Sequence, residues 1–137
     1  MSVYAIDASV VVKFLLKGER VVVKRLASLL RKSRGNKLRL ISSTLLPLEV
    51  GNALRYSLRD KEKLNIVIFK FFGLPIEFIN LSNSQIQEAI GLSFDLGTTV
   101  YDTSYHILAK ANGAIFLTCD REYFKKAKKL GDIELVG

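Results

Sequence analysis

The chain has 137 residues, of which 21 are lysine or arginine and 13 are aspartate or glutamate, so its formal net charge is +8. This length predicts a single domain over residues 1–137, and the 49% of hydrophobic residues excludes extended disorder. The one cysteine, Cys119, excludes an internal disulfide and a cysteine-rich zinc site. No run of about 20 apolar residues is present to span a membrane. We therefore expect a basic, cytoplasmic domain with no membrane partner.

The basic residues are concentrated in two segments. Eight of them, with no acid, lie between Arg20 and Arg39, and five, with one acid, lie between Arg121 and Leu130. Solvated helix faces explain such segments as well as binding to nucleic acid, to an acidic membrane surface or to an acidic protein does. Charge alone therefore identifies no partner.

Short apolar runs alternate with amphipathic segments along the whole chain. In chain order we predict a strand at 3–6, a helix from residue 9, a helix at 19–33, a strand at 38–42, helices at 45–58 and 61–72, a strand at 76–81, helices at 82–96 and 99–111, a strand at 114–118, a helix from residue 121 and a strand at 133–136. The expected N-caps include Ser9, the pair Ser43-Thr44 and a capping box from Ser82 to Gln85. Wholly apolar strands alternating with helices predict a three-layer α/β/α sandwich with a central, mainly parallel sheet of about four to five strands.

Two predicted strands are followed by an aspartate. Asp7 comes after the first strand, and Asp120 comes shortly after the strand at 114–118. Parallel strands place their carboxyl ends at one edge of the sheet, where ligands of such folds bind. Either aspartate alone is explained as a helix cap, but the pair at equivalent strand ends favours a site.

Two further acids have unusual positions. Glu49 lies at the margin of the apolar face of its helix, where a carboxylate is costly unless it is paired or binds a metal. Asp102 lies in the first turn of its helix, where it also suits the helix dipole and a capping box with Thr99. Four converging carboxylates would need protonation, basic partners or a divalent cation to relieve their repulsion.

Carboxylate oxygens without a sulfur or imidazole cluster suit Mg²⁺ or Mn²⁺, and such a site can hydrolyse phosphodiesters. A basic surface around it would hold a nucleic-acid backbone. Other chemistries are poorly supported, because glycine-rich nucleotide motifs and a G-x-S-x-G motif are missing. The one histidine, His106, is expected to be structural, and Cys119 is expected to be a small packing residue.

With these acids in place, the sequence resembles PIN-domain proteins, and most of all the VapC-type toxins of prokaryotic toxin–antitoxin systems. The resemblance covers nearly the whole chain, and it rests on the order and spacing of short segments that are individually weak. They are Ala5-Ile6-Asp7-Ala8-Ser9, Leu48-Glu49-Val50-Gly51-Asn52, Tyr101-Asp102-Thr103-Ser104-Tyr105 with Leu108-Ala109, and Leu117-Thr118-Cys119-Asp120-Arg121.

The resemblance implies a metal-dependent endoribonuclease that hydrolyses RNA, is held inactive by a cognate antitoxin and forms a homodimer. It implies an acidic site for one or two Mg²⁺ or Mn²⁺ ions made of Asp7, Glu49, Asp102 and Asp120, with Asp7 and Asp102 as the foremost direct ligands. Ser9, Asn52 and Thr118 match supporting polar positions. Some relatives carry a further acid after the last aspartate, whereas here only Glu122 lies nearby.

Two other functions remain open at this point. One is a catalytically weak PIN-like module that only binds RNA or a partner, although intact acids at all four positions speak against it. The other is a phosphatase with an aspartyl nucleophile at Asp7, which is weakened because Ala8-Ser9 follow and no second aspartate stands two residues on.

Overall fold

A computed structural model describes all residues from Met1 to Gly137. The strands are β1 (Ser2–Ile6), β2 (Leu38–Ser43), β3 (Glu77–Ile79), β4 (Ile115–Thr118) and β5 (Ile133–Leu135). The helices are α1 (Ala8–Leu15), α2 (Arg20–Arg34), α3 (Leu46–Ser57), α4 (Lys61–Phe72), α5 (Asn83–Leu96), α6 (Val100–Ala111) and α7 (Arg121–Ala127), which continues into the 3₁₀ turn η1 (Lys128–Leu130). None of these helices is long and apolar enough to cross a lipid bilayer.

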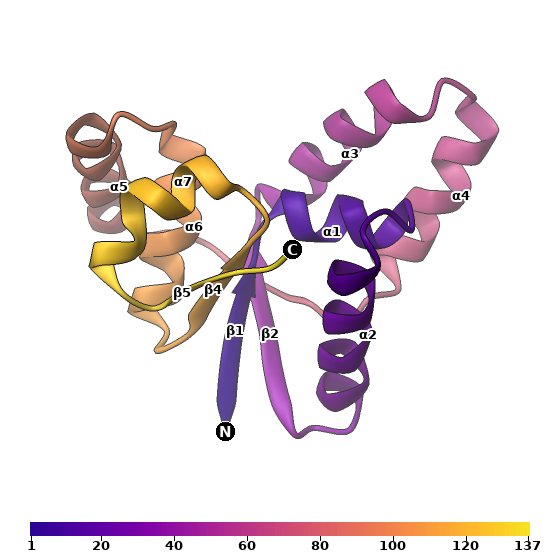
Figure 1. Ribbon diagram of the computed structural model, residues 1–137, viewed down its shortest axis with the longest axis horizontal. Helices are drawn as coiled ribbons and strands as arrows, with labels where there is room; N and C mark the ends of the chain where they lie inside the picture. Colours follow the sequence, from indigo (N-terminus) through magenta and orange to yellow (C-terminus); the bar gives the residue numbers. More distant parts are fainter.

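The five strands form one sheet in the order β3-β2-β1-β4-β5, and every neighbouring pair is parallel. Figure 1 shows α1 to α4 on one side of this sheet and α5 to α7 on the other. The central strands are covered on both faces, and Ala5, Ile6 and Leu117 are completely buried. The predicted α/β/α sandwich is therefore confirmed, with a sheet that is entirely parallel.

The strand order creates a crevice at the carboxyl edge of the sheet. The chain leaves β1 toward the layer of α1, and it leaves β4 toward the layer of α7, so the connections from these neighbouring strands diverge. Ligands of open parallel sheets bind where the connections diverge in this way. Asp7 follows β1 directly and Asp120 stands two residues after β4, so both predicted acids border the crevice.

Most predicted boundaries agree with the structure, and three differ. Helix α1 is capped by Asp7, which accepts a hydrogen bond from the Val10 amide, and the predicted cap at Ser9 was wrong because β1 runs straight into the helix. Helix α3 has Leu45 as N-cap without a side-chain bond, since the Ser43 hydroxyl accepts the Leu45 amide just before the helix starts. The strand predicted at 76–81 is shorter and pairs only over β3.

Candidate functional site

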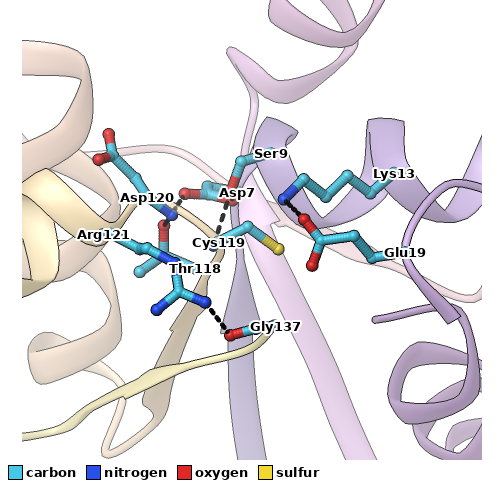
Figure 2. A network of polar contacts seen from close by, with 9 residues as sticks. All are labelled: Asp7, Ser9, Lys13, Glu19, Thr118, Cys119, Asp120, Arg121 and Gly137. Carbon is cyan, nitrogen blue, oxygen red and sulfur yellow. Dashed lines mark hydrogen bonds and ion pairs between the residues drawn. The ribbon is translucent and has the colours of Figure 1, made fainter. Parts of the chain in front are cut away.

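Asp7 lies at the centre of a hydrogen-bonded network that joins β1, α1 and β4. Its carboxylate accepts bonds from the Ser9 hydroxyl at 2.6 Å, the Thr118 hydroxyl at 2.7 Å and the Val10 amide at 3.2 Å. The Ser9 hydroxyl in turn accepts the Cys119 amide at 3.0 Å. Figure 2 shows Asp7 between Ser9 and Thr118, across the end of the sheet. These donors fix both carboxylate oxygens, so the orientation of Asp7 is determined before any ligand binds.

The charged form of the Asp7 carboxylate is destabilised in spite of these hydrogen bonds. Asp7 is 7% exposed, and burial, with a smaller contribution from the charge of Asp102, raises its pKa to about 6. The bonds from Ser9, Thr118 and Val10 oppose this rise without cancelling it. At neutral pH the protein therefore holds a buried negative charge that its own groups stabilise only in part.

The other three predicted acids surround the same crevice from three different helices. Glu49, on α3, is half-buried, and burial together with the charge of Asp102 raises its pKa despite a hydrogen bond from Tyr105 at 2.8 Å. Burial and the charge of Asp120 raise the pKa of Asp102, in the first turn of α6. Asp102 thus interacts with each of the other acids. We call Asp7, Glu49, Asp102 and Asp120 the carboxylate cluster.

Helix capping accounts for only part of this arrangement. Asp120 caps α7 by accepting the Tyr123 amide at 3.0 Å, as Asp7 caps α1. The Asp102 amide donates to the Thr99 hydroxyl at 3.2 Å, and no return bond from the Thr99 amide to the Asp102 carboxylate completes the capping box. Capping explains why these acids begin helices, but it does not explain why three helix starts lie around one crevice.

No basic side chain neutralises the carboxylate cluster. The molecule has four ion pairs, and none includes a member of the cluster. The two cations drawn in Figure 2 are engaged elsewhere, since Lys13 binds Glu19 at 2.6 Å and Arg121 binds the Gly137 carbonyl at 2.6 Å. The charge of the cluster is therefore left for a ligand to balance.

The donor chemistry of the cluster fits a hard divalent cation, because carboxylate and hydroxyl oxygens gather there without sulfur or imidazole. In the positions observed, however, no three His, Cys, Asp or Glu side chains lie close enough together to hold one ion. An ion would thus have to draw the acids on α3 and α6 toward Asp7, which is already fixed.

The supporting residues expected from the sequence divide into two groups. Ser9 and Thr118 contact Asp7 directly, and Thr118 also accepts the Asp120 amide at 3.1 Å. Asn52 is exposed one turn beyond Glu49, and its side chain makes no hydrogen bond to the protein. The structure thus places two of the three polar residues in the network and leaves Asn52 outside it.

A hollow of about 240 Å³ beside the cluster adds residues that the sequence did not single out as part of a site. Asp102, Asp120, Glu122 and Lys126 line it together with Thr98 and Thr99. Lys126 donates to the Gly97 carbonyl at 3.0 Å, so it joins α7 to the loop before α6. Glu122 and Lys126 are one helical turn apart on α7, the helix that Asp120 caps, and this position on the capped helix was the available signal in the sequence.

His106 and Cys119 behave as the sequence predicted. His106 is completely buried, and its ring contacts the Tyr123 hydroxyl and the Gly131 carbonyl, each at 2.8 Å. Burial lowers the pKa of His106, so the neutral ring donates to Gly131 and accepts from Tyr123. Cys119 is half-buried at the end of β4, and burial raises its pKa to about 11, which keeps the thiol protonated.

A second, basic part of the surface shares no residue with the cluster. A hollow of about 730 Å³ is lined by residues of α1, α2 and α4 and of the turns beside them. Its charged residues are all cations that take part in none of the ion pairs, and we call them the basic hollow: Lys17, Arg20, Lys24, Arg34 and Lys70.

Neither a protein-family model nor a curated protein matches the chain. Three solved structures are similar to it over most of their length. PAE2754 from Pyrobaculum aerophilum is 26% identical, with a TM-score of 0.65, over 93% of this chain and 89% of its own. A chain of a toxin–antitoxin complex from Klebsiella pneumoniae is 12% identical, with a TM-score of 0.65, over 96% and 95%.

The third structure is VapBC2 from Rickettsia felis, bound to a DNA fragment from its promoter. It is 15% identical to this chain, with a TM-score of 0.71, over 98% of this chain and 99% of its own. Identities of 12 and 15% speak for the fold alone. At that level the similarities confirm the PIN-like fold of VapC-type toxins that the sequence indicated.

Proposed function

We propose that this protein is a VapC-type toxin, and that it hydrolyses RNA phosphodiester bonds with the carboxylate cluster and Mg²⁺ or Mn²⁺. The observation that carries the proposal is the cluster itself. Four acids from separate segments border the carboxyl edge of a parallel sheet, three of them have raised pKa values, and no cation neutralises them. A divalent cation relieves such repulsion, and in a nuclease site it can activate water and stabilise the charge on the phosphodiester.

Asp7 and Asp102 would be the principal ligands, with Glu49 and Asp120 holding a second ion or orienting water. When bound, the cation would activate the attacking water and stabilise the charge that develops on the phosphodiester. Ser9 and Thr118 keep the Asp7 carboxylate in place, so its ligand geometry does not have to be organised at the moment of reaction. The basic surface would draw the RNA backbone toward the acidic crevice.

The experiment is cleavage of a 5′-labelled RNA by the purified protein, with added Mn²⁺ and with excess EDTA. We expect cleavage only with the metal, and none from Asp7→Asn, in which the asparagine still caps α1. Cleavage that continues in EDTA, or at an undiminished rate in Asp7→Asn, would overturn the metal assignment. RNA binding without any turnover would favour the alternative of a PIN-like binding module.

The similarity to chains of toxin–antitoxin complexes supports a cognate antitoxin as protein partner. A homodimer is the second expected assembly, and exposed apolar side chains on α5 and at the start of α6 support it. The largest of these are Ile90, Phe94 and Tyr101, which are 51, 88 and 58% exposed. Sedimentation of the chain alone, and after co-expression with the product of the neighbouring reading frame, tests both partners.

A further inference from the structure

Tyr105 is a buried tyrosine whose hydroxyl points at the carboxylate cluster. The residue is 1% exposed, and its ring stacks on Phe116 with centroids 6.2 Å apart and planes 9° apart. Its hydroxyl donates to Oε1 of Glu49 at 2.8 Å. Burial and the charge of Glu49 raise the pKa of Tyr105, so the phenol stays protonated and remains a donor. Neither capping nor the reaction proposed above makes use of this contact.

The contact joins α3 and α6, two of the helices that carry acids of the cluster. Tyr105 lies three residues after Asp102, so both belong to one face of α6, whereas Glu49 lies on α3. The phenol is the only protein group that donates a hydrogen bond to the Glu49 carboxylate. Without it, a glutamate with three rotatable bonds would be free to turn away from Asp102 toward water.

A purely structural account explains less of this arrangement. A buried tyrosine hydroxyl needs a partner, and a neutral acceptor serves without adding charge. Tyr123, which is 2% exposed, illustrates this case, because its hydroxyl pairs with the neutral His106 ring. Tyr105 instead pairs with a half-buried carboxylate that has no cation, and its hydrogen bond stabilises the charged form of Glu49, which packing alone does not require.

We propose that Tyr105 is a positioning residue, which keeps the Glu49 carboxylate on the side of Asp102, so that a divalent cation has less rearrangement to impose on the carboxylate cluster. This inference rests on the proposed function. Tyr105 acts through Glu49 and does not itself touch the substrate. The ring packs against Phe116 in the core, so its hydroxyl restricts the directions in which the Glu49 carboxylate can turn.

The test is a Mn²⁺ titration followed by thermal melting without RNA, on the wild type, Tyr105→Phe, Glu49→Gln and the double variant. We expect Tyr105→Phe to need about tenfold more Mn²⁺ for half of the stabilisation, as loss of a group supporting a ligand typically does. The double variant should need no more Mn²⁺ than Glu49→Gln alone. An unchanged titration in Tyr105→Phe, or a full additional effect in the double variant, would overturn the role.

Thr103→Val is the control, since it removes an equally buried hydroxyl from a bond with the Ala89 carbonyl, which is not part of the cluster. It should lower the melting temperature without changing the Mn²⁺ titration. An equal change in the titrations of both variants would show that lost stability is responsible, which also overturns the role. In RNA cleavage at limiting Mn²⁺, Tyr105→Phe should lower kcat and leave KM unchanged.

Two outcomes separate this inference from the proposed function. A wild-type protein that shows no stabilisation by Mn²⁺ contradicts the metal site itself. If the wild type is stabilised by Mn²⁺ and Tyr105→Phe is stabilised at the same Mn²⁺ concentrations, only the role of Tyr105 is contradicted. Should Tyr105→Phe fail to fold, Glu49→Asp keeps the charge but withdraws it from the phenol, and the same roughly tenfold rise is expected.

Discussion

The carboxylate cluster and the basic hollow both gather charge of one sign, but they differ in burial. Lys24 and Arg34 of the basic hollow are exposed, so water and salt screen their repulsion at little cost to folding. Asp7 of the cluster is 7% exposed, and its charge is desolvated. Unopposed charge on a surface is ordinary, whereas unopposed charge in a crevice is expensive unless a ligand compensates it. Burial therefore makes the cluster the stronger indication of a ligand.

The largest effect should come from Asp102, because its charge acts on every other member of the cluster. Asp102→Asn should abolish RNA cleavage. The fold should survive, since the cap from Thr99 to the Asp102 amide needs no carboxylate, and relief of repulsion should keep the melting temperature at or above that of the wild type. Cleavage assays and thermal melts measure the two effects.

Asp60→Asn provides the matched control for that experiment. Asp60 caps α4 on the exposed surface, by accepting the Glu62 amide at 2.9 Å, and asparagine caps equally well. This variant should cleave RNA at the wild-type rate. Equal losses in the two variants would mean that the assay does not report on the cluster.

The buried charge of Asp7, unlike the exposed charges of the basic hollow, should make the free energy of unfolding depend on pH. Burial raises the pKa of Asp7 from 3.8 to about 6, so between these values the folded protein binds a proton that the unfolded chain releases. The free energy of unfolding in EDTA should therefore fall by about 3 kcal/mol as pH rises from about 4 to about 6, and the contribution of Asp7 should be constant above that.

Urea unfolding of the wild type and Asp7→Asn across this pH range measures that fall. Glu49 and Asp102 contribute in the same direction, so a smaller decline should remain in the variant. A decline of the same size in both proteins would contradict the assignment of the buried charge to Asp7.

Thr118→Val tests how far the cluster depends on the network around Asp7. Thr118 is completely buried, and valine keeps its shape while removing the bond to Asp7. We expect about 10- to 100-fold weaker activation by Mn²⁺, the usual range for groups that support metal ligands. Thr103→Val is the comparison variant, because the equally buried Thr103 hydroxyl bonds the Ala89 carbonyl, away from the acids. If both variants respond alike to Mn²⁺, the network has no special role.

The smallest effect should come from the basic hollow. Lys24→Gln combined with Arg34→Gln should weaken RNA binding several-fold. The slope of the logarithm of the binding constant against the logarithm of the salt concentration should become shallower by about 0.7 for each lost phosphate contact. Cleavage of a short oligonucleotide should keep its kcat. Lys128→Gln combined with Lys129→Gln makes the same change of charge on η1, and equal effects of the two pairs would show that net charge, rather than the basic hollow, attracts RNA.

Sequence reasoning succeeded where one local rule decides the outcome. Helix α4 has its predicted bounds because Asp60 caps its start and Gly73 stands after its end. The capping box at Ser82 forms as predicted. Asp7 and Asp120 were placed at one edge because parallel strands leave no other choice. The N-cap of α1 is Asp7 and not the predicted Ser9. Hydrophobic periodicity does not locate the start of a helix that follows a strand without a linker.

Contacts between segments that are far apart in the chain could not be predicted from the sequence. Glu49 and Tyr105 are 56 residues apart, and their bond depends on how α3 and α6 pack at the edge of the sheet. The same packing leaves Asn52 exposed although it is only one turn from Glu49. Helix periodicity assigned Glu49 to the margin of an apolar face, but it could not show which partner would meet it there.

Calorimetric titration of Mn²⁺ into the wild type and Asp7→Asn, without RNA, measures whether the carboxylate cluster binds a divalent cation. We expect saturable binding to the wild type, with a melting temperature that rises with Mn²⁺, and loss of both responses in Asp7→Asn. Equal binding by the two proteins, or none by the wild type, would contradict binding of a cation by the cluster.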